Sequence, residues 1–310
     1  MKSILTRLAL TLPVVWLVVS LVFLLIHLVP GDPIQQMLGD GATPTDTATL
    51  RHQYFLDLPL PQQYLRYWAG VLHGDLGNSI RLHDTVAHLI AARYPYTLAL
   101  TLTALGLGLL LALPAGILAA VNRGRWLDQL LSVVSLFGLS VPGLVLGPVL
   151  ILVFSISLGW LPVSGANSGG SASIDWRYLV LPSIAMGASL AAILTRMVRT
   201  AMLEELSQDY IRTARAKGLS ETAVVCRHAL PNALVPIITV VGLQFGALLA
   251  GAIVTETIFS WPGLGRLTVS AISNRDYALV QGCLLSIGLT YVLGNLLTDV
   301  VYRWVNPRMR

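Results

Sequence analysis

Long apolar runs without charge dominate this sequence and restrict its possible folds more than any other feature. A helix crosses the ~30 Å hydrocarbon core of a bilayer with about 20 residues, because each residue advances it by about 1.5 Å. The mean hydropathy of +0.72 over 310 residues is far above that of a water-soluble domain. Six windows are long enough: residues 8–28, 97–122, 129–158, 178–195, 233–255 and 277–298. We therefore expect an all-α integral membrane protein with six transmembrane helices.

Lysine and arginine are unevenly distributed between the segments that join these windows. With the N-terminus in the cytoplasm, the inner segments hold 13 of them and the outer segments hold 7. Because positive charge accumulates on the cytoplasmic side, this predicts that both termini are cytoplasmic. The first apolar run is too long for a signal-peptide core and no small-residue cleavage site follows it, so we expect an uncleaved first span. The net charge of +5 is then a signal of topology and not of nucleic-acid binding.

This arrangement divides the chain into three regions. Residues 1–29 are expected to form the first transmembrane helix, and residues 30–95 an extracytoplasmic helical cap. Residues 96–310 should form a permease core of five helices with a cytoplasmic loop at 199–233.

Within the cap, Asp84 or Thr85 can begin a helix that we expect to end before Pro95. The cap also contains four histidines, whose spacing places no two at i and i+4 on one helix. They are His52, His73, His83 and His88. We expect ordinary surface histidines here and no metal site.

Charge is concentrated in one internal stretch between two apolar runs, residues 204–236, EELSQDYIRTARAKGLSETAVVCRHALPNALVP. Residues 208–217 contain no Gly or Pro and favour a helix. Gly218 should end it, because the position after a helix often needs a left-handed backbone. Ser220 can cap a second helix, which should stop or bend at Pro231. The stretch predicts a helix, a glycine elbow and a second helix.

This stretch resembles the cytoplasmic loop of binding-protein-dependent ABC importer permeases. Their pattern is Glu-Ala-Ala, three residues, Gly, nine residues, Ile, one residue and Leu-Pro. Counted from Gly218, Leu230 and Pro231 match, and the Ile position falls on His228. The Glu-Ala-Ala positions, of which only the last agrees, fall on Arg212, Thr213 and Ala214.

The resemblance extends along nearly the whole chain. DYIRTARAKGL at 209–219, Gly-Asp-Pro at 31–33 and TETIFSWPGLGR at 255–266 are similar to the permeases of dipeptide, oligopeptide and nickel importers. This implies the type I ABC importer permease fold in a multi-pass protein of the bacterial inner membrane. It also implies import of small solutes, above all di- or oligopeptides, from an extracytoplasmic binding protein. Nickel or metal chelates and glutathione are the alternative substrates.

The resemblance further implies an assembly in the lipid bilayer. Its other members would be a second permease subunit in a heterodimer, two cytoplasmic ATPase subunits and the binding protein. The glycine elbow would occupy a groove on the ATPase, so that ATP-driven closure moves it and tilts the attached spans. The residues implied in this contact, with Tyr210 and Ala214 as its apolar part, are Glu205, Asp209, Tyr210, Arg212, Thr213, Ala214, Arg215, Lys217, Gly218, Leu230 and Pro231.

The sequence lacks the motifs of nucleotide chemistry. A phosphate-binding loop ends in Gly-Lys-Ser or Gly-Lys-Thr, and the two lysines, Lys2 and Lys217, stand in no such setting. We expect a pore-forming subunit that is not an enzyme and binds no cofactor itself, with ATP and Mg on the partner ATPase subunits. The competing hypothesis is a self-sufficient channel or secondary transporter, which would need charged residues at mid-bilayer depth.

Four residues are candidates for a gate or pore: Ser140, Pro142, Gly143 and Glu256. The alternative for the first three is packing and bending, because Pro and Gly interrupt a helix and small residues let helices approach closely. A glutamate near the end of a span is costly unless it is paired or in water. The alternative for Glu256 is therefore a structural ion pair with Arg266 or Arg275.

Overall fold

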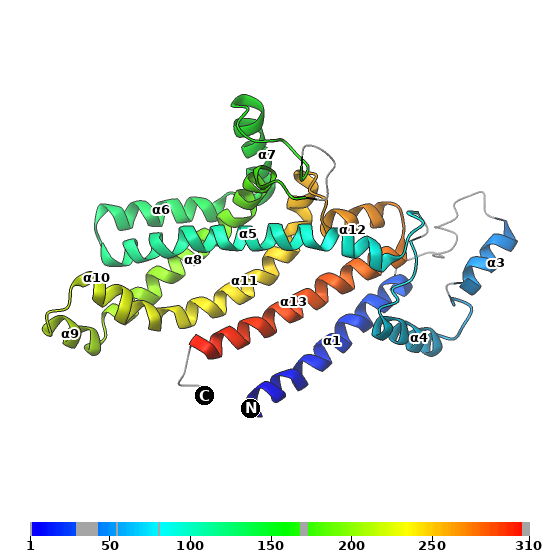
Figure 1. The fold of residues 1–310 in the computed structure, drawn as a ribbon, viewed down its shortest axis with the longest axis horizontal. Coiled ribbons are helices and arrows are strands. Elements are labelled where there is room, and N and C mark those ends of the chain that lie inside the picture. The colour runs from blue at the N-terminus through cyan, green and yellow to red at the C-terminus, as the bar shows by residue number, and fades with distance from the viewer. Residues whose placement is uncertain (1, 29–42, 54, 80, 168–172, 306–310) are drawn as a thin grey trace. The chain divides into compact units, whose positions relative to one another are not determined.

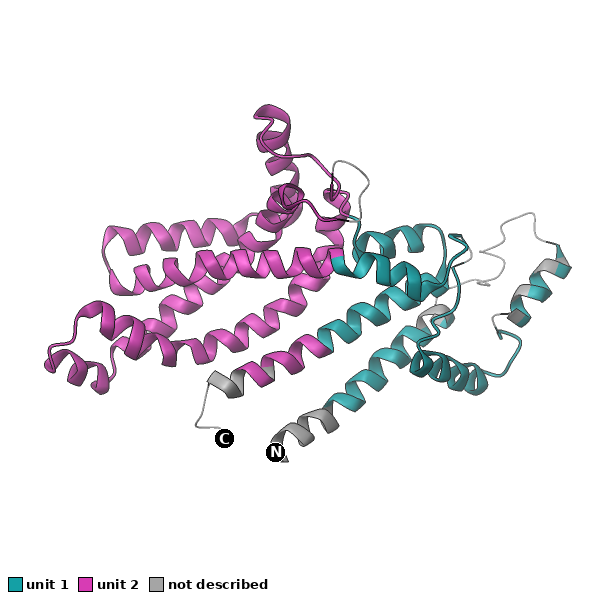
Figure 2. Cartoon of the chain, viewed as in Figure 1, with its two compact units in different colours: residues 1–95, 262–292 teal, residues 96–261, 293–310 magenta. Residues whose placement is uncertain are grey.

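The computed structural model describes residues 2–28, 43–53, 55–79, 81–167 and 173–305. Within these residues the regular structure is helical, apart from an isolated bridge between Asn78 and Thr85. The expected all-α class is confirmed. The chain divides into two compact units, shown in teal and magenta in Figure 2: Met1–Pro95 with Pro262–Val292, and Tyr96–Trp261 with Leu293–Arg310.

Unit 1 consists of short helices together with parts of two long ones. Its elements are α1 (Lys2–Leu28), α3 (Pro44–Gln53), α4 (Leu60–His73), the start of α5 (Val86–Val121), α12 (Leu264–Ser273) and most of α13 (Tyr277–Val305). Aromatic side chains hold α4 against α1, where the Tyr64 hydroxyl lies 2.7 Å from Ser20 Oγ and the Phe23 ring packs on Tyr67. Burial beside α1 raises the pKa of Tyr67 to about 12.

Helix α5 begins where the sequence predicts and ends elsewhere. Thr85 Oγ1 accepts a hydrogen bond from the amide of His88, as expected for an N-cap. The helix then continues through Pro95 to Val121, over 36 residues, so the expected end before Pro95 is wrong. Proline removes one backbone hydrogen bond, and long membrane helices tolerate this where neighbouring groups compensate.

Unit 2 is a bundle around α8, seen in Figure 1 between α5, α6 and α11. Its elements are the rest of α5, α6 (Trp126–Ser140), α7 (Gly143–Leu150), the π-helical segment η1 (Ile151–Ser157), α8 (Trp176–Leu206), α9 (Asp209–Ala216), α10 (Glu221–Ala223), the π-helical segment η2 (Val224–Ala229), α11 (Leu230–Ile258) and the end of α13.

Small residues bring the helices of unit 2 close together. A Cβ at Gly116 of α5 would lie 2.5 Å from Cβ of Val198, and a Cβ at Gly187 of α8 would lie 2.8 Å from the carbonyl oxygen of Ala104. Neither distance leaves room for a methyl group. These glycines therefore allow the backbones of α5 and α8 to approach closely, as is common between membrane helices.

The described residues contain four helices that are long and apolar enough to cross a membrane: Val86–Val121, Trp176–Leu206, Glu221–Ile258 and Tyr277–Thr298. A fifth candidate, Trp126–Ser140 with Gly143–Ser157, is bent by 98°. In α1 the apolar part is the shorter run Thr11–Leu24. The number of six spans and the cytoplasmic position of both termini remain predictions.

Candidate coupling site

The charged stretch forms the connection between the two long helices α8 and α11. Figure 1 shows α9 and α10 at the end of unit 2 where α5 is followed by α6. Between α9 and α10, Gly218 has a φ of 79°, which is the left-handed conformation that glycine adopts at low cost. Ser220 Oγ accepts a 3.4 Å hydrogen bond from the amide of Ala223 and so caps α10. The predicted helix, glycine elbow and helix are all present, and the three together are called the elbow below.

The second helix does not stop at Pro231, so of the two outcomes that we expected there, a stop or a bend, the first is wrong. Pro231 stands in the first turn of α11, and one helical run continues from Glu221 to Ile258. Just before the proline, η2 widens to π-helical geometry over Val224–Ala229. A proline ring clashes with the carbonyl four residues earlier, and a wider turn moves that carbonyl away. The helix therefore passes through the proline instead of stopping there.

The inner face of α9 belongs to the core of unit 2. Ile211 is fully buried and Ala214 is 6% exposed, and both pack in one cluster with Met202 of α8 and Val224 of η2. We expected Ala214 to make an apolar contact with a partner, but it has almost no exposed surface for one. Ala214 matches the last Ala of the Glu-Ala-Ala pattern, and the small space beneath α9 explains why a small residue stands at this position.

The hydroxyl group of Tyr210 links α9 to three neighbouring segments, α8, η2 and α11. It donates to the carboxylate of Glu205 at the end of α8, and it accepts a 3.0 Å hydrogen bond from Nδ2 of Asn232 in α11. Asn232 also donates to the carbonyl oxygen of His228, at 3.3 Å. The ring of Tyr210 remains 40% exposed. The sequence predicts Glu205 and Tyr210 as separate contact residues, whereas the structure brings them together as a brace.

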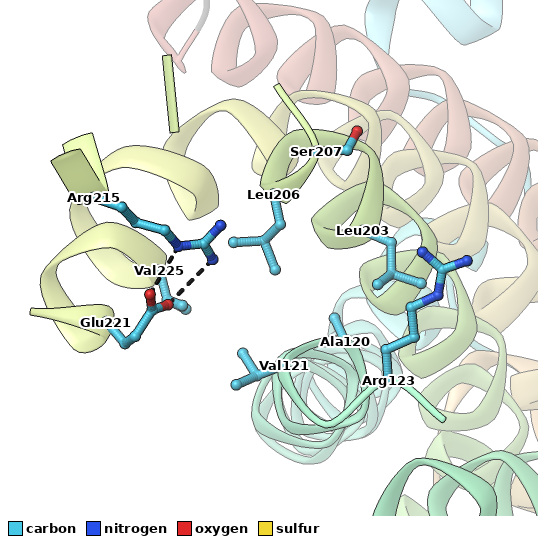
Figure 3. A pocket seen from close by; sticks show the side chains of 9 residues that line it. All are labelled: Ala120, Val121, Arg123, Leu203, Leu206, Ser207, Arg215, Glu221 and Val225. Atoms are coloured by element: carbon cyan, nitrogen blue, oxygen red, sulfur yellow. Dashed lines mark hydrogen bonds and ion pairs between the residues drawn. The ribbon is translucent and has the colours of Figure 1, made fainter. Parts of the chain in front are cut away.

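An ion pair spans the elbow itself. Arg215 Nε and Nη2 donate to the two carboxylate oxygens of Glu221, at 2.8 and 3.2 Å. This hydrogen bond to Glu221 raises the pKa of Arg215 above its ordinary value. Figure 3 shows the pair at one side of a pocket of about 300 Å³. The pocket is lined by Ala120, Val121, Arg123, Leu203, Leu206, Ser207, Arg215, Glu221 and Val225.

The outer face of the elbow is mainly polar. The exposed members of the predicted set are Asp209, Tyr210, Arg212, Thr213, Arg215, Lys217, Gly218 and Pro231. Arg212 lies 3.3 Å from Asp209, in a pair exposed to solvent. Leu230 is half-buried against the core cluster. Leu219 is 41% exposed directly after Gly218 and is not among the predicted residues, although an apolar residue at the tip of a polar turn is a signal in the sequence.

The predicted gate residues lie apart from the elbow. Ser140 ends α6 and Pro142 precedes α7, so they flank the 98° bend, and bending is confirmed as a role of this segment. A Cβ at Gly143 would contact the carbonyl oxygen of Ala185 at 3.7 Å. Glu256, near the far end of α11, is fully buried.

The buried carboxyl group of Glu256 has a partner within its own unit. Thr97 Oγ1 donates a 2.6 Å hydrogen bond to Glu256 Oε1. This contact was not predicted. Whether Glu256 also pairs with Arg266 or Arg275 remains a prediction, as does a role of these four residues in a gate.

Gly-Asp-Pro at 31–33 lies outside the described residues. In the cap, the described histidines His52 and His88 pair with Asp57 and Asp84, at 2.9 and 2.5 Å. Among all described residues, no group of three or more His, Cys, Asp or Glu side chains has the arrangement of a metal site.

This geometry defines a class of protein. It is a helical membrane protein in which a polar elbow connects two long apolar helices. Comparison with known sequences gives the family. Residues 112–310 match the family described as "Binding-protein-dependent transport system inner membrane component", and residues 1–101 match the N-terminal part described for the same membrane components. The chain belongs to this family of ABC importer permeases.

Curated relatives match over the full length of the chain. It is 44% identical over 310 residues to the "Glutathione transport system permease protein GsiC" of Escherichia coli O6:H1, covering 100% of this chain and 99% of the relative. The protein of the same name from Salmonella paratyphi A is also 44% identical, and that from Escherichia coli K12 is 43% identical, with the same coverage.

Two solved structures share the fold. One is an inward-facing form of the MetNI methionine ABC transporter, with a TM-score of 0.57 and 20% identity over 70% of this chain and 96% of that chain. The other is an amino acid ABC transporter, with a TM-score of 0.52 and 16% identity over 71% of this chain and 94% of that chain. The expected type I permease fold is consistent with both.

Family membership decides between the two classes considered from the sequence. The chain is the permease subunit of an ATP-driven importer in the inner membrane, and ATP hydrolysis belongs to a partner ATPase. A binding protein supplies the solute. The self-sufficient channel or secondary transporter is therefore the wrong class.

Proposed function

We propose that this permease carries glutathione or closely related small peptides into the cell. The observation that supports the proposal is the identity of 43–44% to glutathione permeases over the whole length of the chain. Glutathione is a tripeptide, so this narrows the expected di- or oligopeptide class without leaving it. Nickel and metal chelates become the less favoured alternatives.

The proposed assembly contains a second, different permease subunit. Two permeases would enclose the pore, and two ATPase subunits would bind ATP and Mg on the cytoplasmic side. This chain would contribute no nucleotide ligand, because neither Lys2 nor Lys217 stands in a phosphate-binding loop.

The elbow is the proposed contact with the ATPase. Its exposed polar residues and Leu219 form the outer face, while Ile211 and Ala214 fix α9 to the core. Because α8 leads into the elbow and α11 leads out of it, a displacement of the elbow must move one or both helices. Closure of the ATPase pair on ATP would thus be passed to the pore as a rigid-body movement.

Uptake measurements test the substrate. The complete transporter is expressed in a bacterial strain without its own glutathione importers, and uptake of tritiated glutathione is followed. We expect uptake to depend on this chain and to be abolished by excess unlabelled glutathione, whereas excess nickel has no effect. Uptake of a labelled dipeptide without uptake of glutathione would contradict the proposal.

Gly218→Val tests the contact with the ATPase. A β-branched residue at positive φ is strained by about 1–2 kcal/mol or more, although a Cβ at this position meets no atom within 4 Å. We expect the variant to lose co-purification of the ATPase subunits. Gly218→Asn is the matched control, because asparagine tolerates the left-handed conformation and should retain the ATPase. Equal recovery of the ATPase with both variants would show that the elbow geometry does not form the contact.

Two differently tagged copies of this chain test the pairing of subunits. In a heterodimer, each copy should co-purify the second permease subunit and not the other copy. Recovery of both tags in one complex would contradict the heterodimer and leave the substrate proposal unaffected.

A further inference from the structure

An ion pair joins α6 to α8 at the end of unit 2 that carries the elbow. Arg199 Nε donates to Asp128 Oδ1 at 2.6 Å, and Arg199 Nη2 donates to Asp128 Oδ2 at 2.8 Å. The amide of Gly124 donates a third hydrogen bond to Oδ2, at 2.9 Å. The side chain of Asp128 is 6% exposed and that of Arg199 is 30% exposed. Such planar, two-point contacts fix orientation as well as distance.

The position of the pair connects two structural elements that are distant in the sequence. Asp128 lies in the first turn of α6, and Gly124 lies in the turn between α5 and α6 with a φ of 76°. Arg199 lies on α8, seven positions before the helix ends at Leu206 and the chain enters the elbow. The pair therefore fastens the α5–α6 turn to the helix that carries the elbow.

The other contacts of α8 with α5 and α6 include apolar ones and an uncharged hydrogen bond, in which Thr103 Oγ1 of α5 lies 2.8 Å from Ser183 Oγ. A Cβ at Gly108 of α5 would lie 2.7 Å from Cδ2 of Leu190, and one at Gly138 of α6 would lie 3.2 Å from Cβ of Ala192. Apolar contacts of this kind bring helices close but supply no directional bond, and lipid solvates the same surfaces equally well. The three charge-assisted hydrogen bonds of Asp128 are directional and resist a change of register.

Arg196 provides an internal comparison. It lies on α8 three positions before Arg199 and is exposed. In the part of the chain that the structure describes, no ion pair involves Arg196. Arg196 and Arg199 lie on the same helix and carry the same charge, but only Arg199 makes a bidentate contact with Asp128.

We propose that Arg199 and Asp128 are positioning residues of the transport cycle. They join α8 and the α5–α6 turn into one block, so that a displacement of the elbow also moves α5 and α6. This inference rests on the proposed contact between the elbow and the ATPase. Without the ion pair, the ATPase would still bind the elbow and hydrolyse ATP. A smaller part of the elbow's displacement in each cycle would then be passed on to α5 and α6.

The experiment measures transport and ATP hydrolysis together in proteoliposomes that contain the complete transporter and its binding protein. The variants are Arg199→Lys, which retains the charge and loses the two-point contact, and Asp128→Asn. Arg196→Lys is the matched control. We expect ATPase co-purification and ATPase rate to stay within about twofold of wild type in all three, while solute transported per ATP falls about tenfold in the first two only.

A combined Asp128→Arg and Arg199→Asp variant tests the pair as a unit. We expect this variant to recover part of the solute transported per ATP. It should not recover the part that depends on the hydrogen bond from the amide of Gly124 to Asp128. A parallel loss of transport and hydrolysis, or failure of both Arg199→Lys and Asp128→Asn to assemble, would overturn the proposal in favour of simple structural support. An unchanged ratio of transport to hydrolysis would also overturn it. Loss of ATPase binding in Gly218→Val tests the elbow contact separately.

Discussion

The hydroxyl group of Thr97 donates a 2.6 Å hydrogen bond to the carboxyl group of Glu256, 159 positions later in the sequence. Both side chains are buried, with 3% and 0% of their residues exposed. The bond joins α5 to the far end of α11 within unit 2. Because a buried carboxyl group is costly to leave without its donors, the pair also constrains any role of Glu256 as a gate.

Thr97→Val should therefore destabilise the permease. Valine keeps the shape of threonine but cannot donate, so we expect a loss of about 1–3 kcal/mol, measured as a lower apparent Tm in detergent. Thr257→Val is the matched control on α11, since the Thr257 hydroxyl is exposed and bonds only to Ile253 O in the same helix, at 2.8 Å. An equal Tm for the two variants would mean that the Thr97 bond contributes little.

Gly187→Ala should weaken the contact between α5 and α8. The new methyl group would lie 2.8 Å from the carbonyl oxygen of Ala104, and a backbone atom cannot rotate away as a side chain can. We expect a loss of about 1–3 kcal/mol and a lower yield of folded protein, followed by thermal unfolding in detergent. Gly251→Ala on α11 is the control, because its Cβ would meet no atom within 4 Å. A normal Tm for Gly187→Ala would show that the contact with Ala104 adjusts to the added methyl group at little cost.

Tyr210→Phe should loosen the elbow without unfolding it. The variant keeps the ring and loses the hydroxyl that joins Glu205 and Asn232. A loss of about 1 kcal/mol corresponds to about fivefold faster hydrogen exchange for the amides of α9. Thr213→Val is the comparison, because its exposed hydroxyl bonds only to the carbonyl of Asp209, one turn earlier, at 3.1 Å. Unchanged exchange in Tyr210→Phe would indicate that Ile211 and Ala214 alone hold α9.

Ser79→Ala should affect the start of α13 in unit 1. Ser79 Oγ donates to Asp276 Oδ2 at 2.5 Å, and Asp276 Oδ1 accepts from the amide of Leu279 at 3.2 Å. Both side chains are buried, so removing the donor should cost about 1–3 kcal/mol and speed hydrogen exchange in the first turn of α13. Ser270→Ala, at an exposed serine of the same unit, should leave exchange unchanged. Equal exchange in both variants would contradict the role of Ser79.

The local features of the elbow could be predicted because their causes are local. The left-handed backbone at Gly218 and the cap at Ser220 depend on residues that are neighbours in the sequence. The same is true of the long apolar helices. The effect of proline was the exception. The helices continue through Pro95 and Pro231 because a turn widens or neighbouring groups compensate for the lost hydrogen bond, and the proline itself gives no sign of either.

The contacts that hold these elements together were not predictable in the same way. Ala214 was expected to make an apolar contact with the ATPase, but the packing of α9 over Met202 decides which side of α9 is buried. The Arg199–Asp128 pair joins positions 71 residues apart, and an isolated arginine and aspartate carry no sign of their partners. Only the tertiary arrangement of α6 on α8 brings them together.

The uninterrupted helix from Glu221 to Ile258 has a mechanical consequence. At about 1.5 Å per residue, its 38 residues follow a helical path roughly 57 Å long. Glu221 stands at the start of this helix, in the ion pair with Arg215, and Glu256 stands two residues before its end. A twist applied at Glu221 would therefore arrive, without a loop to absorb it, near the buried carboxyl group at the opposite end of the helix.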